Sequence, residues 1–466
     1  MNIILLSGGS GRRLWPLSND TRSKQFLKLL KNDRGDFESM VQRVYGQIKK
    51  AGIKADITIA TGASQVDSIK NQLGDMVDIV IEPERRDTFP AIALACTYLA
   101  YEKNLDDDEV ILVLPVDPYA DMEYFNTLVQ MEEAVLQDVA DLVLMGIKPN
   151  SPSTKYGYIV PAKETISLQN NMNEKYISEK TTIQKVERFT EKPSEEAANL
   201  LISHGAVWNG GVFAFRLRYL MNIIKSHRIS VELKHLSYKE IQKNYKLLNK
   251  ISFDYEVVER ASSVAMVLYD GYWKDMGTWN MLSEEMKENY IGRVTIGEET
   301  RNTTVINELS IPIIALGVKD LVIAASPDGI LITDKIKSTS LKAYVDQISE
   351  RPMYGEGIWG EYRAYDYHQY SDSIKSLTKH LTIKAGQSIA YQAHRIREEI
   401  CTIVSGCGEI VIDGAIKRVG RGDVISIARG QKHAMKAHGP GDLHYIEVQI
   451  GMELEEGDCE GYEWEW

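Results

Sequence analysis

Near its beginning the chain reads Leu6-Ser-Gly-Gly-Ser-Gly-Arg-Arg-Leu-Trp-Pro-Leu17, directly after the apolar run Met1–Leu6. The apolar run predicts a buried first strand. Three glycines then allow the backbone to turn tightly and to approach a ligand without a Cβ in the way, at Gly8, Gly9 and Gly11. Successive free N–H groups in such a turn bind anions, and the two arginines that follow add guanidinium groups suited to phosphate oxygens. The stretch therefore predicts a binding loop for a polyphosphate.

Two familiar glycine loops are excluded by the neighbouring residues. No Gly-Lys-Ser/Thr triplet follows, as a P-loop requires. Leu14 occupies the position where a dinucleotide fingerprint needs its third glycine. A plain strand-to-helix turn stays open as the alternative, but the arginines and the downstream Lys24-Gln25-Phe26 favour a binding loop.

Length and charge limit the class of protein. The chain has 466 residues and a formal net charge of −12. This length predicts two or three domains, and the acidic balance argues against a nucleic-acid partner. The four cysteines form no Cys-x-x-Cys pair, which predicts a reducing compartment and no structural zinc site. With no signal peptide and no bilayer-spanning apolar run expected, we predict a cytoplasmic enzyme without a membrane partner.

Residues 1–290 alternate short apolar runs with helix-like segments. Buried strands are predicted at 56–60, 77–81, 109–114 and 141–145, and helices at 91–103 and 124–137. This alternation predicts an α/β domain built on a Rossmann-like, mostly parallel sheet. Ligands of such sheets bind outside the carboxyl ends of the strands, and the motifs described below follow strand ends.

The pattern changes after residue 290. Short β-like runs at 303–306, 311–316, 321–325 and 329–333 predict a small β unit over 291–345 that packs on the first domain. Residues 351–357 are expected to be a linker. Alternating strands punctuated by glycines then predict a C-terminal β-barrel over 346–466.

Two acidic loops could hold a cation. Asp117 follows the predicted strand 109–114, and Asp275 lies between Trp273 and Trp279. Aspartates beside a phosphate loop are natural Mg²⁺ ligands, and a shared ion could bridge phosphates during an in-line displacement. A turn or N-cap role for Asp117, and core packing for the two tryptophans, stay open as alternatives.

Two further loops carry groups suited to a sugar phosphate. In Phe189–Pro193, Lys192 offers an ammonium to a phosphate and Glu191 can accept hydrogen bonds from sugar hydroxyls. In Trp208–Phe213, Asn209 can both donate to and accept from a hydroxyl. Taken alone, a Glu-Lys-Pro sequence is more typical of a solvated loop.

These motifs occur together and in order, and the set resembles the sugar-phosphate nucleotidyltransferases, most closely the mannose-1-phosphate guanylyltransferases. The matching stretches cover nearly the whole first domain: 6–18, 24–27, 82–88, 90–93, 146–149, 156–159, 189–193, 208–213, 253–255 and 273–279. The resemblance implies transfer of a nucleotidyl group from GTP to mannose 1-phosphate, which gives GDP-mannose and pyrophosphate. The attacking phosphate oxygen is already anionic, so positioning and charge stabilisation would provide the catalysis.

The resemblance also implies roles for individual residues. The nucleotide-binding set would be Leu6, Gly8, Gly9, Gly11, Arg13, Asp87 and Thr88. The sugar-phosphate-binding set would be Gly157, Glu191, Lys192, Asn209 and Gly210. The catalytic charges would be those of Arg13, Lys24 and Lys192, and the Mg²⁺ ligands would be Asp117 and Asp275. Asp87 stands where asparagine is usual, and its carboxylate could accept from guanine N1–H and N2–H or alter the choice of base.

The C-terminal barrel resembles a cupin, the domain that is fused to many guanylyltransferases of this type. In bifunctional relatives it isomerises mannose 6-phosphate and fructose 6-phosphate at a metal site. The resemblance implies a site for Zn²⁺ or a similar divalent metal, made of Gln392, His394, Glu399 and His433. Ile396 and Ile400-Cys401 replace residues that are usual in relatives, so a structural or dimerising barrel is the alternative.

Three functions stay open on the sequence. The first is a guanylyltransferase that binds a nucleoside triphosphate and a sugar 1-phosphate and forms a homodimer. The second is a bifunctional enzyme with an isomerase half, or a nucleotidyltransferase for another sugar 1-phosphate. The third is a non-catalytic sensor of sugar nucleotides, which would keep the pocket but not the turnover.

Overall fold

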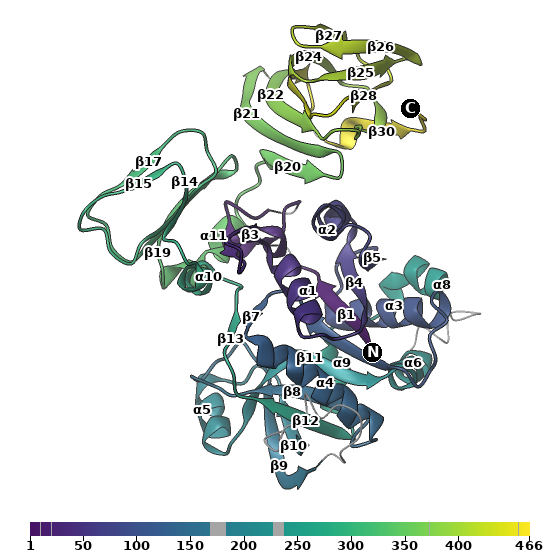
Figure 1. Ribbon diagram of the computed structural model, residues 1–466, viewed down its shortest axis with the longest axis vertical. Coiled ribbons are helices and arrows are strands. Elements are labelled where there is room, and N and C mark those ends of the chain that lie inside the picture. Colours follow the sequence, from purple (N-terminus) through teal and green to yellow (C-terminus); the bar gives the residue numbers. More distant parts are fainter. Residues whose placement is uncertain (10, 20, 168–182, 227–236, 372, 455) are drawn as a thin grey trace. The chain divides into compact units, whose positions relative to one another are not determined.

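The computed structural model describes residues 1–9, 11–19, 21–167, 183–226, 237–371, 373–454 and 456–466 (Figure 1). The chain divides into two compact units. The first unit comprises Met1–Ser10 and Gln25–Met286, and the second comprises Gly11–Lys24 and Lys287–Trp466. The domain limits expected at residues 290 and 345 stay a prediction.

The first unit is built on a nine-stranded sheet with the order β5-β4-β1-β6-β11-β8-β12-β10-β9. The strands are β1 Asn2–Ser7, β4 Asp56–Gly62, β5 Asp78–Glu82, β6 Val110–Pro115, β8 Leu142–Ile147, β9 Tyr158–Ile166, β10 Ile183–Thr190, β11 Val207–Arg216 and β12 Val264–Tyr269. β10 and β11 run against the other strands. The predicted mostly parallel α/β fold is confirmed, and the predicted strands overlap β1, β4, β5, β6 and β8, most of them beginning one residue early.

Helices cover both faces of this sheet. α1 (Met40–Lys50), α2 (Val66–Leu73) and α4 (Met122–Leu136) share a core with Ile3 and Leu5, whereas α3 (Thr88–Tyr101) and α6 (Leu217–Ser226) share one with Ile4. Successive side chains of a strand point to opposite faces, so the interior of β1 is apolar on both faces. This is the physical reason for the apolar residues Ile3–Leu6 near the start of the chain.

Shorter elements complete the first unit and carry its loops. They are β2 Leu30–Lys31, β3 Phe37–Glu38, β7 Pro118–Ala120, α5 Glu195–Ser203, α8 Tyr238–Lys243, α9 Phe253–Glu256, β13 Trp273–Asp275 and α10 Trp279–Glu285. Polar side chains fix several helix starts. Ser39 and Gln42 form a capping box at α1, and Asp121 accepts from two backbone N–H groups at α4. No helix among the described residues combines the length and the apolar character needed to cross a membrane.

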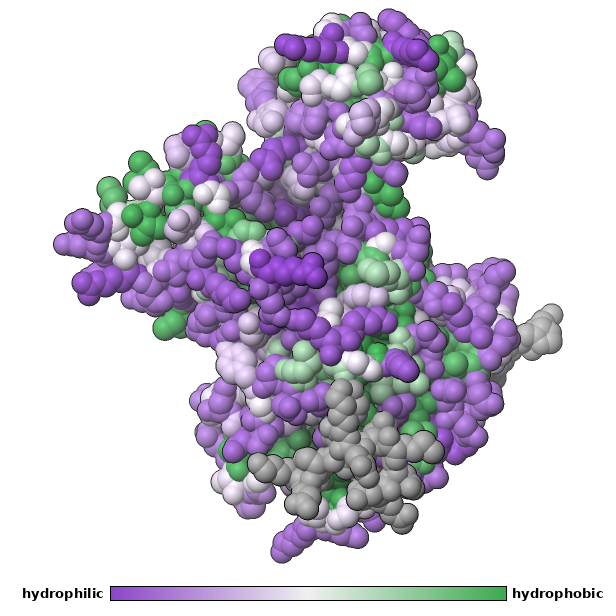
Figure 2. Space-filling view, in the orientation of Figure 1, coloured by the Kyte–Doolittle hydropathy of each residue, from purple (hydrophilic) through white to green (hydrophobic). Residues whose placement is uncertain are grey.

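The second unit is almost entirely β. Its first strands are β14 Tyr290–Gly292, β15 Val294–Ile296, β16 Thr304–Asn307, β17 Ile313–Ala315, β18 Leu321–Ser326 and β19 Gly329–Asp334, followed by α11 Lys342–Val345. They form two small sheets, β14-β16-β18-β19 and β15-β17. Aliphatic side chains that are more than half exposed gather there, on the green region of Figure 2 over these strands: Ile314, Leu316, Ile330, Ile332 and Ile336.

Two larger sheets form the predicted C-terminal barrel. Their orders are β20-β21-β22-β29-β24-β27 and β26-β25-β28-β23-β30. The strands are β20 Tyr354–Gly357, β21 Gly360–Ser371, β22 Ile374–Ile383, β23 Tyr391–His394, β24 Arg397–Ser405, β25 Cys407–Ile412, β26 Ala415–Gly420, β27 Val424–Ile427, β28 His433–Ala437, β29 Leu443–Gly451 and β30 Cys459–Tyr462. The linker expected at 351–357 is only partly correct. Its second half pairs with β21, because Gly355 has no Cβ to meet the Tyr362 ring opposite.

Gly146 in β8 gives a test of the packing between β11 and β12. A Cβ there would lie 2.6 Å from Cγ2 of Val207 and 3.1 Å from Sδ of Met266. We expect Gly146→Ala to lower the free energy of unfolding by about 1–3 kcal/mol, because overpacking shifts both neighbours. Gly62→Ala is the control, since nothing lies within 4 Å of a Cβ at that position. Calorimetry of the full chain should show a lower melting temperature for Gly146→Ala alone, and equal melting temperatures would contradict this account.

Candidate active site

A pocket of about 160 Å³ lies at the carboxyl ends of β1, β4 and β5. Ligands of parallel α/β sheets bind at this edge. The pocket is lined by Leu6, Gly8, Gly9, Ala60, Glu82, Arg85, Arg86, Asp87, Thr88 and Ala91. Five residues predicted to bind the nucleotide are thus brought together, namely Leu6, Gly8, Gly9, Asp87 and Thr88.

Glu82, the last residue of β5, is a member of this pocket that the sequence analysis did not assign. Its side chain is buried, and the Tyr245 hydroxyl donates to its Oε2 over 2.8 Å. Burial raises the pKa of the Glu82 carboxyl. A Cβ on Gly8 would lie 3.5 Å from Oε1 of Glu82, so this acceptor stands directly beside the glycine loop. Glu82 directly follows the strand predicted at 77–81, and an acidic residue at that position could have indicated a binding role from the sequence.

Asp87 and Thr88 have structural duties as well as a place in the pocket. Asp87 has a φ of +72°, which is rare for a residue with a side chain. Its Oδ1 accepts from the Thr88 N–H over 2.8 Å and so caps α3. Oγ1 of Thr88 accepts from the Phe253 N–H over 2.8 Å, which ties α9 to the start of α3. Oδ1 of Asp87 therefore already accepts a hydrogen bond. This leaves Oδ2 as the oxygen that could accept from a guanine base, the role predicted for Asp87 from the sequence.

The remaining residues predicted for the triphosphate, Gly11, Arg13 and Lys24, lie in the segment Gly11–Lys24 of the second unit. Gly11 has a φ of +63°, and a Cβ there would lie 3.0 Å from the Lys24 backbone nitrogen. The segment is anchored by Asn19 to Asp328 (2.6 Å) and by Arg22 to Glu308 (2.9 Å). Arg12, which was expected to place positive charge at the loop, is paired with Asp346 over 3.6 Å.

The loops predicted to bind a sugar phosphate converge at the end of β10. Nζ of Lys192 lies 2.8 Å from Oε1 of Glu191, whose side chain is buried. This hydrogen bond raises the pKa of Lys192. Asn209, near the start of β11, donates through its Nδ2 to Oδ1 of Asp254 over 2.6 Å, and its N–H donates to the Gly157 carbonyl over 2.8 Å.

Both glycines of this predicted set are required by close packing. A Cβ on Gly157 would lie 2.5 Å from Oε2 of Glu191, and a Cβ on Gly210 would lie 2.8 Å from Cδ1 of Ile147. Gly157 therefore lets the carboxylate of Glu191 approach the backbone. Gly210 lies in an irregular part of β11, where the register with β8 shifts between Asn209 and Phe213.

Asp254, like Glu82, lies in a predicted binding site without a role predicted from the sequence. It belongs to the stretch 253–255, which matches the nucleotidyltransferase family. Burial, followed by the charge of Glu191, raises the pKa of Asp254 to about 7. Asn209 and Lys192 act in the opposite direction but do not cancel the effect. Two carboxyl groups thus share this site with one ammonium, and one of them is protonated below neutral pH.

The two predicted metal ligands are brought together by a short antiparallel ladder. β7 pairs with β13 so that Asp275 lies opposite Pro118, the residue directly after Asp117. Both carboxylates act on the Tyr156 hydroxyl, whose pKa is raised first by burial and then by Asp275 and Asp117. Carboxylate oxygens are the donors that a hard divalent cation prefers.

An aromatic cluster joins this acidic pair to the sugar-phosphate loops. The Tyr156 ring centroid lies 4.9 Å from that of Trp208 and 5.5 Å from that of Trp273. Trp208 directly precedes Asn209, and Trp273 lies two residues before Asp275. Trp279, in contrast, is fully buried, so the core interpretation holds for that tryptophan.

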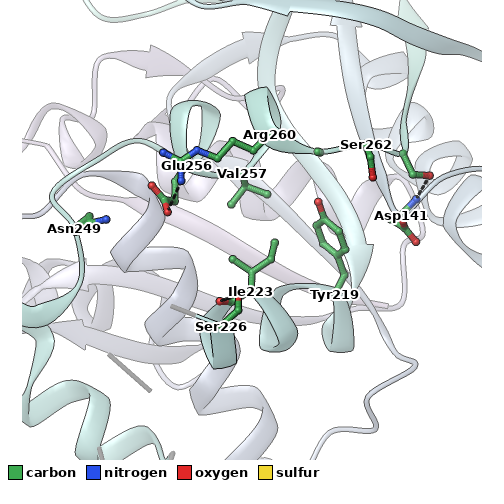
Figure 3. Close-up of a pocket in the computed structure, with 11 residues that line it drawn as sticks. Asp141, Tyr219, Ile223, Ser226, Asn249, Glu256, Val257, Arg260 and Ser262 are labelled. Atoms are coloured by element: carbon green, nitrogen blue, oxygen red, sulfur yellow. Dashed lines mark hydrogen bonds and ion pairs between the residues drawn. The ribbon is translucent and has the colours of Figure 1, made fainter. Parts of the chain in front are cut away.

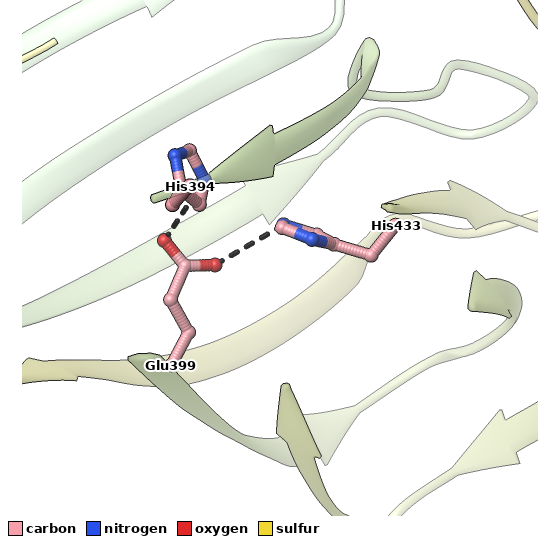
Figure 4. A group of neighbouring side chains, drawn as sticks. All are labelled: His394, Glu399 and His433. Atoms are coloured by element: carbon pink, nitrogen blue, oxygen red, sulfur yellow. Dashed lines mark ion pairs between the residues drawn. The ribbon is translucent and has the colours of Figure 1, made fainter. Parts of the chain in front are cut away.

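The barrel of the second unit contains a separate buried cluster (Figure 4). Ligand atoms of His394, Glu399 and His433 all lie within 4.8 Å of one another. Oε1 of Glu399 is 3.3 Å from Nε2 of His394, and Oε2 is 3.2 Å from Nε2 of His433. Although burial alone would raise it, the hydrogen bond with His433 lowers the pKa of Glu399 to about 2.

The surroundings of the two histidines suit a metal site. Nδ1 of His394 lies 3.4 Å from the Asp458 carbonyl oxygen, and Nδ1 of His433 lies 3.1 Å from that of Gln431. A carbonyl accepting at Nδ1 fixes the orientation of each ring so that Nε2 faces Glu399, and Nε2 is the atom that would bind a metal once it is free of a proton. Burial lowers the pKa of His394, which favours the neutral, ligating form.

Gln392, the fourth predicted ligand, lies beside the cluster and turns its amide nitrogen, not its oxygen, toward His394. Its Nε2 lies 3.4 Å from Nε2 of His394, and its Oε1 accepts from the Cys459 thiol over 2.9 Å. The role of Gln392 as a ligand therefore stays a prediction, and its oxygen accepts from the Cys459 thiol in this structure. Arg397, which was not assigned from the sequence, lies 3.2 Å from Nε2 of His394 and 3.1 Å from Oε1 of Glu399.

Comparison with known proteins finds a matching family model in both parts of the chain. Residues 2–290 match the family model described as nucleotidyl transferase, and residues 351–463 match the one described as mannose-6-phosphate isomerase C-terminal. The chain belongs to the nucleotidyl transferase family. Membership implies a nucleoside triphosphate and a sugar phosphate as substrates, together with a divalent metal.

Relatives match this nucleotidyltransferase over nearly its whole length. A mannose-1-phosphate guanylyltransferase of Escherichia coli K12 is 30% identical, covering 98% of this chain and 96% of the relative. Mannose-1-phosphate guanylyltransferase ManC of Salmonella typhimurium is also 30% identical, covering 99% and 97%. A crystal structure described as mannose-1-phosphate geranyltransferase from Thermus thermophilus is 27% identical with a TM-score of 0.61, covering 75% of this chain and 99% of its own.

The raised pKa of Asp254 predicts a pH-dependent stability. Between its ordinary value of 3.8 and about 7, the folded protein binds this proton and the unfolded chain does not. Proton binding by Asp254 therefore contributes fully to the free energy of unfolding below about pH 4, and this contribution is lost as the pH rises through about 7. We expect Asp254→Asn to flatten the fall in melting temperature between about pH 5 and 8, with the exposed Asp270→Asn as control. Identical slopes in all three proteins would refute the raised pKa.

Proposed function

We propose that the first unit transfers the guanylyl group of GTP to mannose 1-phosphate and releases pyrophosphate. This proposal depends on the pairing of the Asp117 and Asp275 segments in the β7–β13 ladder. The Tyr156 ring connects these segments to the loops that carry Lys192 and Asn209. The names of the full-length relatives support GTP and mannose 1-phosphate as the substrates. No protein nucleophile is needed, because the sugar phosphate oxygen is already anionic.

The acidic pair would hold Mg²⁺. Two observations support the fit: the β7–β13 ladder sets Asp275 opposite the residue after Asp117, and the pKa of Tyr156 is raised by burial and then by the charges of both carboxylates. When bound, the ion would neutralise charge on the phosphates of the reacting nucleotide. Oxygen donors are what Mg²⁺ prefers, and its remaining coordination positions are normally filled by water and phosphate.

The chain's own groups position the sugar phosphate. Lys192 would bind the phosphate through its ammonium, which Glu191 keeps protonated. Glu191 and Asp254 offer carboxyl oxygens, and Asn209 offers an amide, to the sugar hydroxyls. Arg13 and Lys24 would stabilise the triphosphate and the leaving pyrophosphate, as the family resemblance implies.

Base choice would depend on the pocket at the end of β5. The carboxylate of Glu82, beside Gly8, can accept from the N1–H and N2–H groups of guanine, which adenine cannot donate. An assay of four nucleoside triphosphates against several sugar 1-phosphates, read as pyrophosphate release, tests base and sugar together. Highest activity with a pyrimidine nucleotide or with another sugar would replace the proposed substrates.

Asp275→Asn tests the metal role directly. We expect kcat to fall by about 10²–10³-fold, because the variant removes a charge on which the ion and the transition-state phosphates depend. The exposed Asp270→Asn, a few residues away, is the matched control and should keep normal turnover. Near-normal kcat for Asp275→Asn, at every Mg²⁺ concentration tested, would remove the metal role. Binding of GTP and GDP-mannose without any pyrophosphate release by the native chain would favour a sensor instead.

The barrel supports a second candidate function, the isomerisation of mannose 6-phosphate and fructose 6-phosphate with a divalent metal. The buried cluster of His394, Glu399 and His433, with both Nε2 atoms directed at one carboxylate, is the observation that favours it. These three residues would hold the metal, which would supply electrophilic assistance at the sugar carbonyl. Incubation of the full chain with fructose 6-phosphate and detection of mannose 6-phosphate tests the activity.

Metal content gives a separate test of the barrel cluster. We expect the purified chain to carry about one equivalent of a divalent transition metal such as Zn²⁺, and His394→Ala to lose most of it, because three ligands become two. His438→Ala is the control, since that histidine is exposed and outside the cluster. Elemental analysis after dialysis reads out both variants. Equal metal in both would place the metal elsewhere.

We also expect a homodimer, which light scattering coupled to gel filtration tests. The exposed aliphatic side chains of the small sheets support an association of this kind. A monomer at every concentration would contradict it.

A further inference from the structure

The segment Gly11–Lys24 carries two of the charges predicted for the triphosphate, those of Arg13 and Lys24. Its described residues form one short 3-10 turn, Arg12–Leu14, and the next such turn begins at Lys24. A segment with so little regular structure takes its direction from the residues that contact it. Residues 308–354 of the second unit supply such contacts.

The turn between β18 and β19 packs against the Trp-Pro pair of this segment. Oγ of Ser326 donates to the Pro16 carbonyl over 2.7 Å, across 310 positions of the sequence, and both residues are buried. A Cβ on Gly329 would lie 2.5 Å from Cζ2 of Trp15, so the absence of a side chain lets the Trp15 ring pack on the turn. The segment and the turn are therefore fitted to each other.

Asn19 organises the end of the segment and ties it to the same turn. Its Oδ1 accepts from the Thr21 N–H over 2.9 Å and from the Arg22 N–H over 2.7 Å, which closes an Asx turn. Its Nδ2 donates to Oδ2 of Asp328 over 2.6 Å. Oδ1 of Asp328 accepts from the Met353 N–H over 2.5 Å, directly before β20. The Asp328 carboxylate thus uses one oxygen for the segment and the other for the start of the barrel.

Arg22 adds a charged contact close to Lys24. Its Nη1 lies 3.0 Å from Oε1 and 2.9 Å from Oε2 of Glu308, and its guanidinium lies 4.8 Å from the centroid of the Tyr354 ring. Arg22 and Glu308 are half-buried, and a charge-assisted hydrogen bond is stronger than a neutral one. The pair therefore fixes the backbone two residues before Lys24.

We propose that Asn19 and Asp328 are positioning residues for nucleotidyl transfer, which act through the backbone of this segment on the charges of Arg13 and Lys24. The inference rests on the proposed function, because it takes the triphosphate as the ligand of those charges. Arg13 is exposed and Lys24 is half-buried, so the positions of both charges depend on the backbone that carries them. Loss of the bond between Asn19 and Asp328 weakens triphosphate binding. It leaves the sugar-phosphate loops unchanged, since those loops belong to the first unit.

An exchange of the two side chains tests this role. Asn19→Asp keeps the acceptor for the Thr21 and Arg22 N–H groups but sets a carboxylate against Asp328. We expect KM for GTP to rise at least about tenfold, with KM for mannose 1-phosphate within about twofold of native, because the repulsion displaces the segment alone. The double variant Asn19→Asp/Asp328→Asn restores the bond with donor and acceptor exchanged and keeps an amide oxygen for the Met353 N–H. It should return KM for GTP to within about threefold of native.

Two controls add the same charge elsewhere. Asn302 donates to Oδ1 of Asp320 over 2.6 Å, a bond of the same kind in the second unit, and its Oδ1 accepts from Lys335. Asn302→Asp should therefore keep the native KM for GTP. Ser262 lies at the exposed rim of a cavity beside α6 and α9 (Figure 3), just before β12 and at the amino edge of the sheet. Ser262→Asp should also leave this KM unchanged, and melting curves check the fold of every variant.

Three results would overturn the proposal: a native KM for GTP in Asn19→Asp, an equal rise in Asn302→Asp, or a double variant no better than Asn19→Asp. Calorimetric binding of GTP to the full chain, without sugar, separates this proposal from the proposed function. A native chain that binds GTP but releases no pyrophosphate would refute the proposed function alone. The dissociation constants of the same variants for GTP would then decide the role of Asn19 and Asp328 by the same three criteria.

Discussion

The pairing of β7 with β13 is the constraint on which the rest of the first unit's site depends. Asp117 and Asp275 are far apart in the sequence, and like charges so close together repel each other. The backbone ladder between these two three-residue strands holds them in place regardless of that repulsion. The same ladder carries Trp273 against Tyr156 and Trp208, so the acidic pair and the sugar-phosphate loops are positioned by one packed cluster.

The electrostatics of the sugar-phosphate loops follow from an imbalance of charge. Two carboxyl groups, that of Glu191 and that of the half-buried Asp254, lie near one ammonium, and Lys192 is bonded to only one of them. The carboxyl that lacks the ammonium takes up a proton near neutrality, and it can then both donate to and accept from a hydroxyl. Under the proposed function, such a site would discriminate among sugars through hydrogen bonds, and Lys192 would bind the phosphate.

The barrel follows a different physical rule, because its polar groups are enclosed within a β-structure. Glu399 can be buried only because Arg397 and the two histidines contact it. The backbone carbonyls behind both histidines fix the orientation of the two rings, with Nε2 facing Glu399. Such preorganisation is costly for a purely structural barrel, and it is consistent with the proposed metal site.

The sequence by itself determined the apolar strands of the sheet, the glycine loop, and the acidic and basic loops at the strand ends. These features are local, since apolar periodicity and turn residues act within a few positions of each other. It could not assign Glu82 or Asp254, whose importance comes from burial among distant residues such as Tyr245 and Asn209. Nor could it show that Arg12 is paired with Asp346, or that the Gln392 oxygen is held by Cys459. Tertiary structure decided these points, because hydrogen-bond partners and desolvation depend on which segments the fold places side by side.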